Sequence, residues 1–171
     1  MTKPIMNVAD VDLQPRPPAF APTGAAAELY DARIAFVSRR MGATSLGYNV
    51  TAVPPGKRAF PFHSHLTNDE MFFVLSGTGE IRIGEEVHPI RPGDIISCPA
   101  GGPQTAHQII NTGTEELRYL AVSSMHMPEI AEYPESGRFG LLAPLTSASD
   151  GSPRMLMYMG REDDTLPYWD S

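Results

Sequence analysis

The chain has 171 residues, a net charge of −7 at pH 7 and a pI of about 5.1, and 42% of its residues are hydrophobic. This length suits one domain with room for a sizeable core. The acidic balance, with no cationic run longer than Arg39–Arg40, argues against a nucleic-acid partner. No stretch approaches the roughly 20 apolar residues of a membrane-spanning helix, so we expect no membrane partner.

Cysteine usage and the N-terminal residues bear on the compartment. The single cysteine, Cys98, excludes an internal disulfide, which fits a reducing environment. Residues 1–18 contain no apolar run of signal-peptide length and carry acidic side chains early. We therefore expect a cytoplasmic protein.

Residues 1–43 are expected to form an N-terminal arm outside the main domain. Prolines at positions 15, 17, 18 and 22 prevent a regular helix or a central strand in its first part. Residues 29–41 alternate weakly between apolar and polar side chains and favour a strand. We expect a strap across the surface, and an arm exchanged between two subunits is the alternative.

Residues 44–123 predict an all-β domain. The 17 prolines and 15 glycines stand mostly as single interruptions, which favours short strands joined by turns. Leu46, Tyr48 and Val50 alternate with smaller or polar residues, as expected of a half-buried strand. Further strands are expected at 59–66, 70–76, 80–83, 87–90, 95–98, 105–110 and 117–123. Seven or eight short antiparallel strands predict a small barrel or jelly roll.

Residues 124–171 are expected to form a C-terminal extension that packs on the barrel. It contains one predicted short strand, Met155–Met159, and an acidic, aromatic end. Together with the N-terminal arm, this extension adds surface that a lone barrel does not need. We therefore expect a homodimer.

Four side chains in the predicted barrel suggest a metal site. Successive side chains of a strand point to opposite faces, so His63 and His65 share a face and can converge on one ion. Glu70 follows a polar stretch long enough to reverse the chain, and His107 comes from a distant strand. A closed barrel would bring these strands together.

This ligand set suits a divalent transition metal. Neutral imidazole nitrogens and one carboxylate are ligands of zinc, manganese, iron and nickel, and the sequence does not choose among these metals. Four protein ligands on an octahedral ion would leave two positions open for a substrate or water.

The spacing of these residues resembles the two motifs of the cupin superfamily. The first motif is matched by Gly56, His63, His65, Glu70 and Gly77. The second motif is matched by Gly93, Pro99, Gly101, His107 and Asn111. In the second motif the gap between the second glycine and the histidine is five residues, where the family has two.

The resemblance implies a double-stranded β-helix, or jelly-roll barrel, that encloses a metal bound by His63, His65, Glu70 and His107. Gln104 stands at the nominal position of the family's second-motif histidine, so its replacement of that ligand is an alternative to His107. Asn111 is expected to start a turn before Thr112 and Gly113.

The chain also looks similar to small bacterial cupins considered to be sugar-phosphate isomerases. That similarity implies a small-molecule substrate and isomerisation through a metal-stabilised enediolate. The catalytic base is not evident, and Glu70 is a candidate only if it leaves the metal. An Fe(II)-dependent dioxygenase and a non-enzymatic small-molecule-binding module remain alternatives, because one fold hosts many functions.

Overall fold

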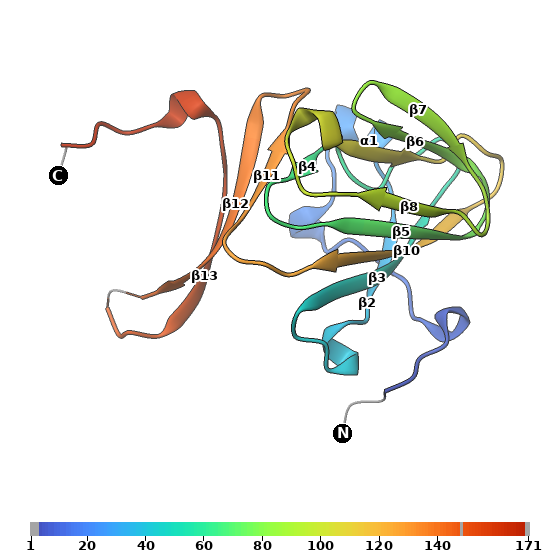
Figure 1. The fold of residues 1–171 in the computed structure, drawn as a ribbon, viewed down its shortest axis with the longest axis horizontal. Coiled ribbons are helices and arrows are strands. Elements are labelled where there is room, and N and C mark those ends of the chain that lie inside the picture. The colour runs from blue at the N-terminus through green and yellow to red at the C-terminus, as the bar shows by residue number, and fades with distance from the viewer. Residues whose placement is uncertain (1–3, 148, 170–171) are drawn as a thin grey trace.

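Antiparallel strands in two facing layers form the main domain, as a computed structural model shows for residues 4–147 and 149–169 (Figure 1). The larger sheet has the strand order β1 (Gln14–Pro15), β2 (Arg33–Phe36), β3 (Leu46–Val53), β10 (Leu117–Ser124), β5 (Glu70–Ser76) and β8 (Ile95–Cys98). The facing layer begins with β7 (Glu86–Ile90), β6 (Gly79–Ile83) and β9 (His107–Ile110).

The facing layer continues through an isolated bridge between His63 and His107. Beyond this bridge lies a four-stranded sheet in the order β4 (Ser64–His65), β11 (Glu129–Tyr133), β12 (Arg138–Thr146) and β13 (Pro153–Gly160). The segment from residue 58 to residue 65 therefore joins β9 to the strands of the C-terminal extension.

Helical structure is limited to short pieces. The α-helix α1 (Ala25–Leu29) lies in the N-terminal arm, and 3₁₀ turns occur at Val8–Asp10, Pro18–Phe20, Arg39–Met41, Pro103–Thr105 and Glu162–Asp164. Within the described residues, no helix is long and apolar enough to cross a membrane.

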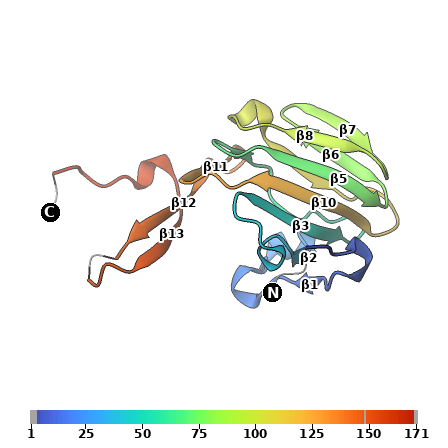
Figure 2. The same ribbon diagram turned by 60° about the horizontal axis from the view of Figure 1, so that its bottom comes forward.

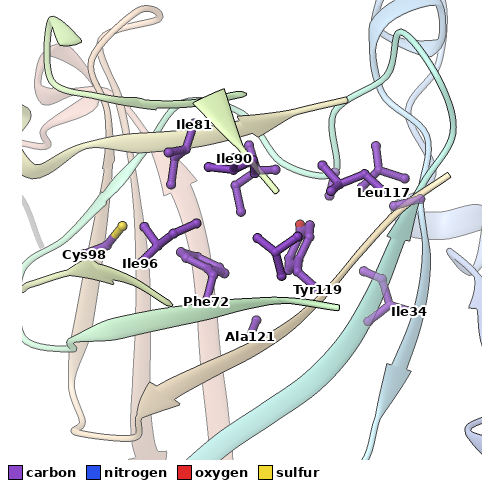
Figure 3. Close-up of a cluster of buried hydrophobic side chains, with 14 residues drawn as sticks. Ile34, Phe72, Ile81, Ile90, Ile96, Cys98, Leu117, Tyr119 and Ala121 are labelled. Carbon is purple, nitrogen blue, oxygen red and sulfur yellow. The ribbon is translucent and has the colours of Figure 1, made fainter. Parts of the chain in front are cut away.

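The core lies between the two layers (Figure 3). In β10, Leu117, Tyr119 and Ala121 are buried while the residues between them are half-exposed, so the strand alternates with period two. These side chains and Phe72 of β5 face Ile81 of β6 across the interior. The predicted all-β jelly-roll fold is confirmed.

A tight turn from residue 91 to residue 94 reverses the chain between β7 and β8. Gly93 has a φ of +94°, which a residue with a side chain rarely adopts, and Asp94 N donates to Arg91 O at 3.1 Å. The reversal places β8 beside β5, whose first residue is Glu70.

The strand predicted at 59–66 is much shorter than expected, because only Ser64 and His65 form regular pairs. Pro61 has no N–H group to donate to a ladder. His63 nevertheless exchanges two backbone hydrogen bonds with His107, of 3.2 and 2.8 Å. This bridge holds the two histidine backbones side by side.

The C-terminal extension contains more strand than the single one predicted at 155–159. β11 pairs with β4, and β12 and β13 form a long hairpin that projects from the barrel (Figures 1 and 2). Met155, Met157 and Met159 share one face of this hairpin and are 49%, 70% and 53% exposed. Such a long exposed apolar face is unusual for a monomer.

The homodimer remains a prediction, which this hairpin makes testable. We expect light scattering to give twice the chain mass of 18.6 kDa. Met157→Asp should shift the protein to the monomer, because an unpaired charge is costly in an apolar interface. Val87→Asp, a change at an exposed position of β7, is the matched control. A wild-type protein at the monomer mass would contradict the prediction.

Candidate metal centre

The four predicted ligands lie on segments that meet at the junction of the two layers. His63 precedes β4, His65 ends it, and Glu70 begins β5 after the chain reverses over residues 66–69. His107 begins β9 and is held beside His63 by the backbone bridge. Strand ends from the two layers thus bring these side chains to one place.

Three of the side chains form a compact group. One ligand atom each from His63, Glu70 and His107 lies within 4.8 Å of the others. Glu70 Oε2 is 2.9 Å from His107 Nε2 and 3.6 Å from His65 Nε2. His65 therefore lies outside the compact group but shares the same carboxylate oxygen. All four predicted ligands adjoin one another around Glu70.

Each histidine directs its Nδ1 atom away from this centre. His63 Nδ1 is 2.8 Å from Pro61 O, and His107 Nδ1 is 3.3 Å from Thr105 O. A carbonyl accepts from a protonated Nδ1, which leaves Nε2 with a lone pair for a metal. His65 Nδ1 lies 3.5 Å from Glu129 Oε1, a carboxylate in the corresponding place.

The environment of His65 fits a bound metal. Both of its ring nitrogens are buried and have no hydrogen-bond partner within the described residues. An unsatisfied buried polar atom costs about 1–3 kcal/mol. A divalent ion beside Glu70 would satisfy Nε2 of His65 and would accept the other two imidazoles as well. The donor set therefore fits a transition metal, without specifying which one.

The charge states of His63 and Glu70 also suit metal binding. Burial, together with the nearby His107 and His65, lowers the pKa of His63 to about 4, so His63 is neutral at pH 7. Burial alone would raise the pKa of Glu70, but its contacts with His107 and His65 outweigh burial and hold that pKa well below its usual range. The site therefore offers a neutral imidazole and an ionised carboxylate to a cation.

Glu129 is a functional candidate that the sequence analysis missed. It is only 7% exposed and accepts hydrogen bonds from Leu66 N at 3.1 Å and Thr67 Oγ1 at 2.6 Å, and also from Asn68 Nδ2. It thus ties β11 to the loop between His65 and Glu70. Its distance along the chain from the other site residues gave no spacing signal.

A pocket of about 270 Å³ opens over these side chains. Aromatic and aliphatic side chains form most of its wall, and the polar groups come from the candidate ligands, Asn49, Gln108 and two tyrosines. Its lining consists of Asn49, Phe60, His63, His65, Glu70, Phe72, His107, Gln108, Ile109, Tyr119, Ala121 and Tyr133. Tyr119 lines this pocket, whereas Tyr48 of β3 is not part of its wall.

Gln104, the alternative to His107, lies on the exposed 3₁₀ turn Pro103–Thr105 and does not line the pocket. The inserted residues between Gly101 and His107 form this turn before β9 begins. His107 therefore occupies the position beside Glu70, and Gln104 does not.

Asn111 takes the structural role expected from the sequence, and Cys98 is also a structural residue. Asn111 Oδ1 accepts from Gly113 N at 3.0 Å, which makes the predicted turn. Cys98 is buried in the core at 1% exposure. Burial raises the pKa of its thiol to about 12, so the thiol is not a reactive group.

Comparisons with known proteins agree with this geometry. Residues 49–123 match the Cupin domain family (Cupin_2). The chain is 30% identical over 107 residues to the protein SchB of Streptomyces halstedii, across 63% of this chain and 72% of SchB. The chain belongs to the cupin superfamily.

Two further proteins are similar over different extents. The chain is 33% identical over 70 residues to an oxalate-binding protein of Thermotoga maritima, across 41% of this chain and 54% of that protein. A cupin-superfamily sugar phosphate isomerase from Silicibacter pomeroyi has the same fold, with a TM-score of 0.74 and 21% identity over 96% of this chain and 98% of that chain. The chain spans between 50% and 72% of the length of the curated relatives that it matches.

Substitution of His107 tests the ligand set. We expect about one metal equivalent per wild-type chain and its loss in His107→Ala, because the remaining ligands bind less tightly. Elemental analysis after expression with several divalent metals measures this. Gln104→Ala is the matched control and should keep its metal. Loss of metal from Gln104→Ala alone would show that the ligand assignment is wrong.

Substitution of Glu129 tests whether it orients His65. Glu129→Gln keeps the side-chain shape but removes the charge near Nδ1, and we expect metal affinity to fall by about 10- to 100-fold. Competition with a chelating dye measures the affinity. Glu132→Gln, from the same strand, is the control. Equal affinities in Glu129→Gln and wild type, with both folded, would exclude this role.

Proposed function

We propose that the protein is a metal-dependent enzyme that isomerises a small hydroxycarbonyl compound, with sugar phosphates as the preferred class. The observation that carries the proposal is the group of His63, Glu70 and His107, with the unsatisfied His65 beside it, in the lining of one pocket. The similarity in fold to a sugar phosphate isomerase supports the choice of reaction, and it does so only as analogy.

A divalent metal at these four residues would act as a Lewis acid toward the carbonyl and neighbouring hydroxyl oxygens of a substrate. The pocket wall restricts how such a substrate lies. Phe72 and Tyr119 close one side, with ring centroids 5.6 Å apart. Gln108 Nε2 donates to Phe60 O at 2.8 Å, so its amide oxygen is left to accept from a substrate hydroxyl.

Tyr133 is suited to contact a substrate oxygen. Its ring stacks on that of His63, with a centroid distance of 6.0 Å and an interplanar angle of 21°. Burial raises the pKa of the Tyr133 phenol, so the phenol is protonated at neutral pH. Tyr133 can therefore donate a hydrogen bond or a proton, and it is unsuited to abstract one.

Glu70 is the remaining candidate for the base. Among the described residues that line the pocket it is the only carboxylate. Contacts with His107 and His65 lower the pKa of Glu70, and these contacts would change if the two imidazoles bound a metal. Its role as catalytic base therefore remains a proposal beside its role as a ligand.

Hydrogen exchange tests the reaction. With metal-loaded protein in deuterated water, we expect deuterium to enter the carbon next to the carbonyl of an aldose or ketose phosphate, because isomerisation begins by removing that proton. NMR of the recovered sugar measures it. In Glu70→Gln, exchange should be lost. Retained metal would then assign Glu70 as the base, and lost metal would assign it as a ligand.

A panel of aldose and ketose phosphates that exchanges no proton with metal-saturated wild type would contradict the isomerase proposal. The metal-free protein is the control, and it should show only the background exchange of the sugar in buffer.

The aromatic wall favours a second candidate. Phe60, Phe72 and Tyr133 would pack well against a flat, apolar substrate. With Fe(II) in the site, such a pocket would suit a dioxygenase, since iron accepts the same nitrogen and oxygen ligands. Oxygen uptake that requires both Fe(II) and an added aromatic diol would favour this function over isomerisation.

A further inference from the structure

The metal pocket contains no cationic side chain for a phosphate. None of the described residues that line it is a lysine or an arginine. A phosphate in a protein site is normally held by guanidinium, ammonium or backbone N–H donors. If the substrate is a sugar phosphate, its phosphate must therefore lie outside this pocket.

A second pocket of about 450 Å³ adjoins the first, and we name it the outer pocket. Phe60 and Tyr133 line both pockets and form the wall between them. The outer pocket also contains Arg16 and Tyr30 of the N-terminal arm and Arg138 of the C-terminal extension. Both chain extensions therefore meet at the wall of the metal pocket.

Arg16 is fixed at this wall. Its Nη2 donates to Ala59 O at 2.5 Å, and its guanidinium carbon lies 4.5 Å from the centroid of the Phe60 ring. Burial raises the pKa of the Tyr119 phenol, and the charge of Arg16 opposes that rise. Arg16 thus packs on the wall of the metal pocket, and its guanidinium makes no further hydrogen bond or ion pair within the described residues.

Arg138 also lines the outer pocket. It begins β12 and is paired directly with Tyr133 of β11. Directly paired residues of an antiparallel ladder share a face of the sheet. Arg138 is therefore on the same face as Tyr133, and no ion pair to its side chain occurs within the described residues.

The single acidic residue among the described lining residues does not cancel these charges. Glu135 lines the outer pocket, but its Oε1 is 2.6 Å from Arg82 Nη1. Arg82 in turn lies over the Phe62 ring, at 3.9 Å from its centroid. Glu135 is thus neutralised by a third arginine, and the outer pocket keeps a net positive charge from Arg16 and Arg138.

We infer that the outer pocket is a phosphate-binding subsite in which Arg16 and Arg138 hold the phosphate of a substrate whose carbonyl end reaches the metal pocket past Phe60 and Tyr133. This inference rests on the proposed isomerase function for the identity of the substrate. The subsite itself requires only the two arginines. The subsite gives both chain extensions a role in phosphate binding, because the barrel contributes neither of the two arginines.

Titration with inorganic phosphate, followed by ³¹P NMR, tests the subsite without any turnover. The full chain is used after metal removal, so that phosphate cannot bind a metal, and again with metal restored. Loss of one charge-assisted contact should weaken phosphate binding by about 10-fold or more. We expect this in Arg16→Gln and in Arg138→Gln, and no change in Arg154→Gln, a control on exposed β13.

Arg138→Gln decides the test if Arg16→Gln fails to fold, because Arg138 is exposed and makes no contact that the fold requires. Unchanged phosphate binding in Arg138→Gln, or no binding to wild type, overturns the subsite. Acetate is the comparison for a carboxylate ligand, and acetate binding as tight as phosphate binding overturns the assignment to phosphate.

The two proposals fail in different ways. Phosphate binding that depends on Arg138, without exchange of the substrate C–H proton, supports the subsite and contradicts the isomerase. Exchange that proceeds equally well on a neutral sugar and its phosphate, and equally in Arg138→Gln, contradicts the subsite and supports the isomerase.

Discussion

The contact on which the site depends is that of the Glu70 carboxylate with the imidazoles of His107 and His65. An ionised carboxylate in a buried place is costly unless charge or hydrogen bonds compensate it. Here the imidazoles of His107 and His65 compensate the charge. They lie at strand ends of different sheets, which the His63–His107 backbone bridge brings together. The barrel closes where these polar groups meet, and both ring nitrogens of His65 are left without a hydrogen-bond partner there, within the described residues, so a cation fits the same place.

The histidines are oriented by groups outside the centre. Pro61 O and Thr105 O fix the outer nitrogens of His63 and His107, and both carbonyls lie two residues before the histidine that they contact. This local geometry follows directly from the chain. His65 has no such carbonyl, and its Nδ1 instead lies 3.5 Å from Glu129, which the C-terminal extension places there through the pairing of β11 with β4. The extension therefore adjoins the candidate metal centre.

The sequence predicted the all-β fold and its principal turns because period-two alternation and single glycines are local signals. It also identified the histidines and Glu70 as candidate ligands, since their spacing follows from strand geometry and from a family motif.

The sequence did not predict Glu129. This residue is far along the chain from the other site residues and comes close to them only in the folded protein, so it leaves no local pattern. The strand carrying the first two histidines was predicted too long, because apolar content around Pro61 outweighed the missing N–H donor. β11 and β12 were missed for a different reason. β11 is short and mixes acidic with apolar residues, and in β12 the successive apolar residues Leu141, Leu142 and Ala143 and the following Pro144 hide the alternation by which a strand is recognised.

The arrangement divides the chemistry between the barrel and its extensions. The barrel supplies the candidate ligands together with Phe60 and Phe72, and Tyr133 of the C-terminal extension completes the aromatic wall. This wall does not select a charge on the substrate. Arg16 and Arg138 come from opposite ends of the chain and adjoin the pocket only because each extension returns to the same rim. Since a barrel of this kind hosts many reactions, selection among substrates must come from residues added to it. In this chain the added residues lie where the two extensions meet, at Phe60 and Tyr133.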